Sequence, residues 1–186
     1  RSEKLKTLNL PKESKIILSI ANLKPQKNPL DMVKAAKIVA AKIPNAVFLY
    51  LGTGELKEKT ENLIKRYRLA NNFKLLGHRD DASELLAISD CFALTSLWEG
   101  LPMALVEALS MQTPAVCYDA GGIGEILQSG QNGFLIQRGN YHDLAAAILL
   151  VLESKLNFKQ DAATLKEFDI RTMLKKQEAL YREDLK

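Results

Sequence analysis

The sequence predicts an α/β domain with a doubly wound, Rossmann-like parallel sheet. Six short apolar segments of strand character alternate with segments whose apolar residues recur at helical spacing. The first strand segment, residues 15–21, is almost continuously apolar, which is typical of a strand buried on both faces of a parallel sheet. The connections are long enough to return each strand parallel to the last. A chain of 186 residues suits one well-buried domain.

The remaining elements follow in chain order. Residues 1–14 are polar, contain Pro11 and have the composition of an interdomain linker. The expected strands are residues 15–21, 46–51, 73–76, 91–94, 114–118 and 133–136. The expected helices are residues 30–43, 55–67, 82–88, about three turns from Pro102, a short helix near residue 125, and residues 141–152. We expect one domain over residues 15–168 and a C-terminal helix over residues 169–186 that packs loosely.

Composition excludes several functional classes. Apolar residues make up 47% of the chain and charged residues 26%, and the net charge of +4 is mild. Lys and Arg form no stripe interleaved with aromatic residues, so nucleic acid is not the expected partner. The only cysteines, Cys91 and Cys117, lie in strand segments and are expected to be reduced and packed. With two separated histidines, a structural zinc site is not expected.

The stretch from Thr95 to Leu109 carries the chemistry. A strand ends there, and the turn 99–102 supplies Gly100 for close backbone approach and Pro102 for the first helical position. A helix start leaves backbone N–H groups unpaired and carries partial positive charge. This pattern therefore predicts a site for a phosphate or another anion.

Glu107 is the only charged residue between residues 101 and 112, and its apolar neighbours predict that it is buried. A buried carboxylate requires hydrogen-bond donors, and a ribose diol attached to the bound phosphate would supply them. Alternatively, Glu99 only favours the helix dipole and Glu107 pairs with a lysine or a backbone donor. A glycosidase-like acid and base pair fits less well, because it needs carboxylates on opposite sides of a sugar.

The other loops at the same edge of the predicted sheet suit a nucleotide. They are residues 22–28, 52–54, 77–80, 96–103 and 119–125. Three carry glycine beside a predicted helix start, and the first carries two lysines. The first strand is not followed by Gly-x-Gly-x-x-Gly, and no Walker A loop is present, which disfavours dinucleotide dehydrogenases and P-loop ATPases.

These motifs resemble the donor-binding half of retaining GT-B glycosyltransferases, including bacterial enzymes of surface polysaccharide synthesis. The most specific motif is Glu99, seven intervening residues and Glu107, within Ser-Leu-Trp-Glu-Gly-Leu-Pro. Residues 119–125, Gly52-Thr53-Gly54 and residues 77–81 follow in the order expected of the family.

The resemblance implies a role for each motif residue. Glu99 would contact hydroxyls of the donor sugar, Glu107 would hold the ribose, and Lys27 would neutralise the diphosphate. Glu99 and Lys27 are thus the candidate catalytic residues. The base, which could be uracil, guanine or adenine, would lie against His78 and Arg79. The candidate donor-binding set is Asn22, Lys24, Gly52, Gly54, His78, Arg79, Gly100, Leu101, Pro102, Met103, Glu107, Gly122 and Glu125.

The resemblance implies a retaining hexosyltransferase that uses a nucleoside-diphosphate sugar, no metal and no other cofactor. The family's N-terminal acceptor domain is missing, so we expect this chain alone to bind donor weakly and to transfer little. The whole enzyme is expected in the cytoplasm, with a membrane-associated acceptor and peripheral attachment to the inner face of the membrane through that domain. Where the family usually has Arg, this sequence has Asn22, and Lys24 is the candidate substitute.

Plainer interpretations remain for several residues. Lys27, His78 and Arg79 could be solvated loop residues, and Glu125 could serve only the start of a helix. Trp98 is expected to pack beneath the motif. A noncatalytic nucleotide-sugar binding domain is the main alternative, because a fold does not fix a function. A GT-B epimerase or phosphorylase is a second, although no lysine can be assigned to pyridoxal phosphate.

Overall fold

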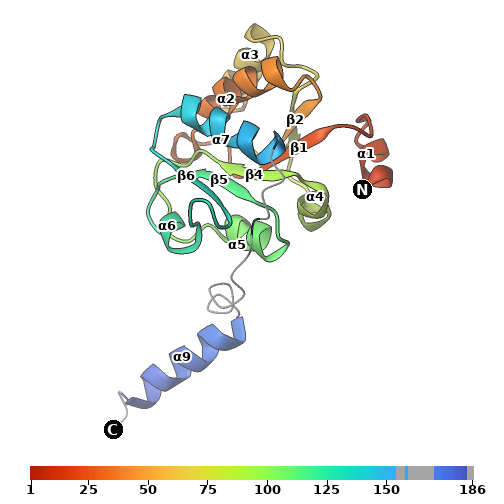
Figure 1. Cartoon of the computed structure of the whole chain (residues 1–186). Coiled ribbons are helices and arrows are strands. Elements are labelled where there is room, and N and C mark those ends of the chain that lie inside the picture. The colour runs from red at the N-terminus through yellow and green to blue at the C-terminus, as the bar shows by residue number, and fades with distance from the viewer. Residues whose placement is uncertain (154–157, 159–169, 184–186) are drawn as a thin grey trace.

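The computed structural model of the chain describes residues 1–153, 158 and 170–183. One six-stranded sheet has the order β3-β2-β1-β4-β5-β6, and every strand pair is parallel (Figure 1). The strands are β1 (Lys15–Ile20), β2 (Ala46–Leu51), β3 (Phe73–Gly77), β4 (Cys91–Leu94), β5 (Ala115–Tyr118) and β6 (Gly133–Ile136). The predicted doubly wound fold is therefore confirmed, and the observed strands differ from the expected ones by at most one residue at either end.

Helices cover both faces of the sheet (Figure 1). On one face α2 packs between α3 and α7, while α4 and α5 cover the other. These helices are α2 (Pro29–Lys42), α3 (Lys57–Arg66), α4 (Ala82–Ile88), α5 (Met103–Ser110), α6 (Ile123–Ile126) and α7 (Tyr141–Glu153), and a 3-10 turn, η1 (Pro25–Lys27), follows β1. Burial on both faces explains why strands such as β2, which is buried along its whole length, are continuously apolar.

The order in which strands are added to the sheet reverses between β1 and β4. These two strands pair through Ile17 with Cys91 and Leu18 with Phe92, although more than 70 residues separate them. The chain after β1 proceeds towards β2, whereas the chain after β4 proceeds towards β5. In doubly wound sheets, the loops that part at such a point leave a crevice in which ligands bind. The fold therefore directs attention to the loops after β1 and β4.

The N-terminal segment is more ordered than a linker composition suggests. It contains α1 (Ser2–Thr7), and Leu5, Leu8 and Leu10 are buried in the hydrophobic core. Three leucines in a lysine-rich segment give too short a periodic pattern to be recognised as a helix in the sequence.

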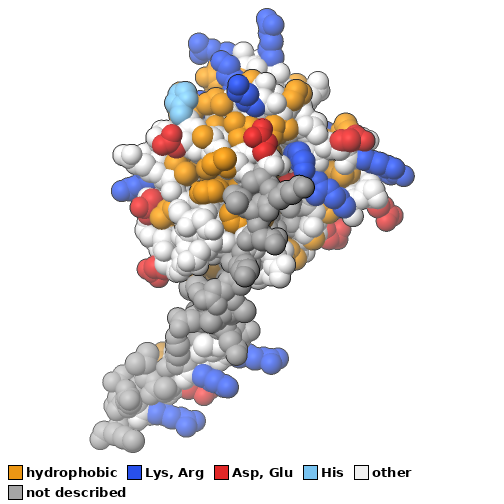
Figure 2. Space-filling model, viewed as in Figure 1, with side chains coloured by type: hydrophobic (Ala, Val, Ile, Leu, Met, Phe, Trp, Pro, Cys, Tyr) orange, Lys and Arg blue, Asp and Glu red, His pale blue; other side chains and the backbone are white. Residues whose placement is uncertain are grey.

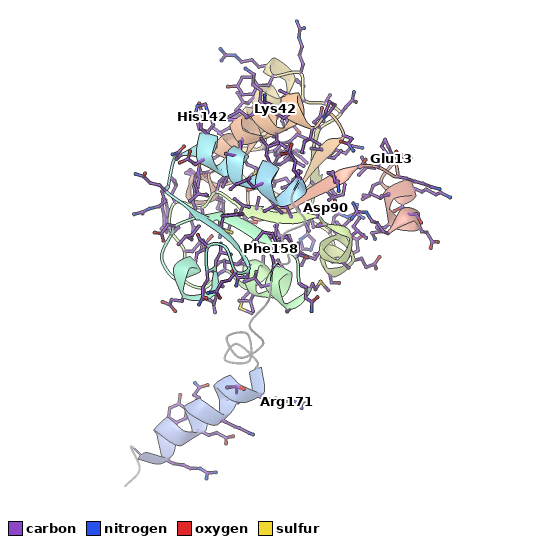
Figure 3. The ribbon with its side chains drawn as sticks, viewed as in Figure 1. Glu13, Lys42, Asp90, His142, Phe158 and Arg171 are labelled. Carbon is purple, nitrogen blue, oxygen red and sulfur yellow. The ribbon has the colours of Figure 1, made fainter. Side chains whose placement is uncertain are left out.

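Two basic side chains hold α1 against the domain. Lys4 forms ion pairs with Asp81 and Glu84, and the guanidinium of Arg1 contacts Asp90 at 2.6 Å. Asp90, labelled in Figure 3, also accepts the backbone N–H of Ile16. A linker role for residues 1–14 remains a prediction, but the segment is packed.

The chain beyond α7 is described only in part. Phe158, which is labelled in Figure 3, packs against β6. Its ring lies edge-on to that of Phe134, with the ring centroids 6.0 Å apart. Helix α9 (Ile170–Glu183) is drawn apart from the sheet and its covering helices (Figure 1). The domain boundary expected between residues 168 and 169 lies outside the described residues.

The visible face carries charges of both signs, and the cysteines are free and packed as predicted. On the face shown in Figure 2, Lys and Arg side chains are interspersed with Asp and Glu. Cys91 and Cys117 are free and buried, and burial raises the pKa of both thiols. Among the described helices, none has the length and apolar character needed to cross a membrane.

Candidate functional site

An ion pair joins the two candidate catalytic residues. Lys27 ends the 3-10 turn after β1, and Glu99 lies in the loop after β4. Because β1 and β4 are neighbours in the sheet, the two loops lie side by side. Lys27 Nζ lies 2.5 Å from Glu99 Oε1. The Lys27 side chain is 20% exposed and that of Glu99 only 6%. Lys27 is therefore not a solvated loop lysine, and Glu99 does more than favour a helix dipole.

The turn after Glu99 presents unpaired backbone donors. Within the described chain, the N–H groups of Gly100, Leu101, Met103 and Ala104 have no hydrogen-bond acceptor. Pro102 has no N–H and is the N-cap of α5, so the helix begins one residue later than expected. Free amides and the positive end of a helix dipole at one turn are the features of an anion site.

Two glycines support this turn from behind. Gly121 has a left-handed φ of +59°, and a Cβ added to it would lie 1.9 Å from the Glu99 carbonyl oxygen. A Cβ on Gly122 would lie 2.4 Å from the Gly100 carbonyl oxygen, which accepts the Gly122 N–H at 3.2 Å. The close approach of the two backbones thus requires glycine at both positions. For Gly122, support of the turn is a role that the sequence did not indicate.

A pocket of about 300 Å³ opens beside the ion pair. It collects five residues of the candidate set, namely Asn22, Lys27, Gly52, His78 and Arg79. Its other lining residues come from the ends of β1 and β2, from β3 and from the start of α4. Three of the five loops that were predicted to bind a nucleotide, residues 22–28, 52–54 and 77–80, therefore meet at one cavity, whereas its described lining includes no residue of loops 96–103 and 119–125.

Arg79 is fixed in the wall of this pocket. Its Nε and one terminal nitrogen each donate to Asp81 at 2.7 Å, and Asp81 also accepts from Lys4. These cations hold the pKa of the Asp81 carboxyl well below its usual range, with Arg79 the larger cause. His78, by contrast, has a side chain that is 86% exposed. The sequence motif included Asp81 but gave no sign that it holds Arg79.

The environment of Glu107 differs from the prediction. Glu107 is exposed, whereas its apolar neighbours in α5 are buried. A helix turns about 100° per residue, so residues adjacent in sequence lie on different sides of the helix. The expectation of a buried carboxylate is therefore wrong, and the argument from its burial no longer applies. No described residue forms an ion pair with Glu107, and its contact with ribose remains a prediction.

Other candidates lie around the site without direct contact to it. Lys24 and Glu125 are exposed, and neither lines the pocket among the described residues. Gly54 faces Leu23, whose carbonyl oxygen would be 2.5 Å from an added Cβ. Trp98 is 56% exposed, so the expectation that it packs beneath the motif is wrong.

A parallel sheet of this topology, with a cation, a carboxylate and unpaired amides where the strand order reverses, defines a Rossmann-like α/β domain with a candidate anion site. The model of the family described as "Glycosyl transferases group 1" matches residues 1–167. The chain belongs to this family and forms its C-terminal, Rossmann-like domain.

Individual relatives agree with this assignment. The chain is 35% identical over 156 residues to UDP-Gal:alpha-D-GlcNAc-diphosphoundecaprenol alpha-1,3-galactosyltransferase of Escherichia coli, covering 82% of this chain and 40% of that protein. It is 32% identical over 149 residues to poly(glycerol-phosphate) alpha-glucosyltransferase of Bacillus subtilis, covering 80% and 22%. The chain thus spans well under half the length of either relative. The crystal structure of Anabaena Alr3699/HepE in complex with UDP-glucose superimposes with a TM-score of 0.88 at 26% identity, covering 97% of this chain and 52% of that one.

Proposed function

We propose that the chain binds the donor for an enzyme that moves a hexosyl group from a nucleoside-diphosphate sugar to a glycan or lipid-linked acceptor with retention. The observation that carries the proposal is the meeting of Lys27 with Glu99 beside the free amides of residues 100–104. A cation and converging N–H groups are what a diphosphate requires, and a nearby carboxylate suits sugar hydroxyls. The E. coli galactosyltransferase is named for UDP-Gal and the HepE structure contains UDP-glucose, which favours a UDP sugar as the donor.

Different residues bind different parts of the donor. Lys27 and the turn at Gly100 bind the diphosphate, and Glu99 orients the sugar through its hydroxyls. Arg79, held by Asp81, and His78 lie at the base, and the exposed Glu107 meets the ribose diol. The pocket lined by Asn22, Gly52 and Arg79 then encloses the nucleoside.

The reaction breaks the bond between the anomeric carbon and the phosphate oxygen, which keeps the electron pair. Lys27 and the amides of the turn stabilise the negative charge that develops on this oxygen, usually a large contribution to catalysis. The acceptor hydroxyl forms the new bond to the anomeric carbon on the same face, and its proton passes to the leaving phosphate. These positive groups take the place of a divalent ion, so the proposed reaction needs no metal or other cofactor.

The acceptor would be bound by an N-terminal domain, without which this chain transfers little sugar. We propose that the whole enzyme acts in polysaccharide synthesis in the cytoplasm, at the inner face of the membrane where lipid-linked acceptors are found. The alternative is a noncatalytic nucleotide-sugar binding domain. It is supported by Asn22, which lines the pocket but lacks the positive charge of the Arg that the family usually has there.

A calorimetric titration of the chain with UDP, GDP and ADP, with a sugar conjugate of each and with the three parent nucleosides tests the proposal. We expect one nucleotide, most simply UDP, to bind more tightly than its nucleoside. Negligible binding of all the nucleotides would contradict the proposal. A transfer assay on an enzyme that contains both domains separates catalysis from binding alone, since only an enzyme releases the nucleoside diphosphate in the presence of an acceptor.

A further inference from the structure

Thr95 connects the loop that carries Lys27 to the strand that leads to Glu99. It is the first residue after β4 and is only 1% exposed. Its Oγ1 lies 2.9 Å from the carbonyl oxygen of Lys27 and 2.9 Å from that of Asn28. A hydroxyl carries one hydrogen, so it donates to one of these oxygens at a time and lies within reach of both.

Gln26, which precedes Lys27, also bonds to the chain after Thr95. The Gln26 carbonyl oxygen accepts the Leu97 N–H at 2.8 Å, and Gln26 Nε2 donates to the Trp98 carbonyl oxygen at 3.0 Å. Residues on both sides of Lys27 are therefore bonded to the chain that precedes Glu99. The two loops are held together by the backbone as well as by the ion pair.

The carbonyl oxygen of Lys27 depends on the Thr95 hydroxyl more than the carbonyl oxygen of Asn28 does. The Asn28 carbonyl oxygen also accepts the Asp31 N–H at 3.2 Å, whereas Thr95 is the only donor to the Lys27 carbonyl within the described chain. Asn28 adopts a left-handed φ of 44°, and Pro29 has no N–H to add another bond. The Thr95 hydroxyl is thus the direct anchor of the Lys27 backbone.

We infer that Thr95 is a positioning residue that sets Lys27 against Glu99 and against the diphosphate. A lysine side chain is long and flexible, so the place of its backbone decides which positions its ammonium group reaches. Without the hydroxyl, the Lys27 carbonyl would lack its partner and the loop would move towards solvent. The effect on ligand binding rests on the proposed function, but the effect on the ion pair does not.

The test compares Thr95→Val, which keeps the shape and removes the hydroxyl, with Thr95→Ser, which keeps the hydroxyl. Thr113→Val is the matched control, because Thr113 is 4% exposed and donates to the Leu86 carbonyl, just before β5 begins. We expect Thr95→Val to raise the Kd for UDP about fivefold and to leave the Kd for uridine unchanged. Thr95→Ser and Thr113→Val should bind UDP as the unmodified chain does.

A double-mutant cycle distinguishes positioning from general damage. If Thr95 acts through Lys27, Thr95→Val should have no further effect on UDP binding in a chain that already carries Lys27→Met. Independent, additive effects of the two substitutions would overturn the inference. So would a Thr95→Val chain that binds UDP normally.

Crystal structures of the unmodified and Thr95→Val chains provide a test without ligand. We expect the Lys27 and Glu99 side chains to be paired in the first and separated in the second. Retention of the pair in the variant would overturn the inference even if binding were lost. Failure of the unmodified chain to bind any nucleoside diphosphate would instead contradict the proposed function, and the two structures would still decide the role of Thr95.

Discussion

Lys27 Nζ lies 2.5 Å from Glu99 Oε1, although the two residues are 72 positions apart in the chain. The pairing places the group proposed to neutralise a diphosphate next to the group proposed to orient a sugar. Because the Glu99 side chain is only 6% exposed, its charge depends on Lys27 for compensation. The ion pair is therefore relevant both to stability and to ligand binding.

Replacement of Lys27 by Met should reduce the free energy of unfolding by about 1 to 3 kcal/mol, since it leaves a nearly buried carboxylate without its cation. The double variant Lys27→Met with Glu99→Gln should recover much of this loss, because the charge is then absent as well. Urea unfolding of the unmodified chain and of these two variants measures the differences. Lys42→Met, at the exposed end of α2, is the control. A Lys27→Met chain as stable as this control would argue against the pair.

The exposed position of Glu107 separates stability from binding. Glu107→Ala should change the free energy of unfolding by less than about 0.5 kcal/mol. If its carboxylate holds the ribose diol, the Kd for UDP should rise about tenfold, while the Kd for pyrophosphate should not change. Glu58→Ala, on the exposed face of α3, should affect neither. Equal effects of Glu107→Ala on UDP and pyrophosphate would contradict the ribose contact.

Because Gly121 packs closely against the Glu99 loop, any side chain at position 121 should destabilise the fold. Gly121→Ala should lower the free energy of unfolding by about 2 to 4 kcal/mol, from its left-handed φ and the overlap with the Glu99 carbonyl. Gly139 also has a left-handed φ, +81°, but no heavy atom within 4 Å of an added Cβ. Gly139→Ala should therefore cost only about 1 kcal/mol. Similar losses in the two variants, measured by urea unfolding, would exclude a special role for the contact with Glu99.

The ion pairs of Asp81 predict a dependence of stability on pH. Arg79 and Lys4 lower the pKa of the folded carboxyl, so the unfolded chain binds a proton at Asp81 more readily than the folded chain. The stabilisation by Asp81 is complete above its unfolded pKa of about 4 and is lost as the pH falls through the folded value. The difference in unfolding free energy between the unmodified chain and Asp81→Asn should thus be large at neutral pH and shrink in acid.

Urea unfolding at a series of pH values measures this difference. Asp80→Asn is the matched control, since the neighbouring Asp80 side chain is fully exposed. A difference for Asp81→Asn that stays constant down to strongly acidic pH would contradict the assignment.

Much of the fold could be predicted because burial on both faces of the sheet gives strands a simple apolar signature. Segments such as β2 and β4 were located to the residue. Helix α1 escaped prediction because its stabilising contacts, including Lys4 with Asp81, come from residues far along the chain. Tertiary contacts of this kind leave no local pattern in a sequence.

The sequence could predict which loops lie near one another, but it could not predict the contacts between their side chains. Topology places the loops of Lys27 and Glu99 at one edge of the sheet, yet the contact between the two side chains depends on details of loop packing, such as the Thr95 hydroxyl. Glu107 was misplaced because its apolar neighbours in sequence lie on the opposite side of the helix. An assignment of each residue to a side of the helix by its rotation would have predicted the exposure.

The central claim is that the turn at Gly100 and Lys27 together grip a diphosphate. Amide chemical shifts of the isotope-labelled chain, recorded during titration with pyrophosphate and then with UDP, test it most directly. We predict that the N–H signals of Gly100, Leu101, Met103 and Ala104 move with both ligands, and that those of His78 and Arg79 move only with UDP. Shifts confined to other parts of the chain, with the signals of the Gly100 turn unchanged, would contradict the account.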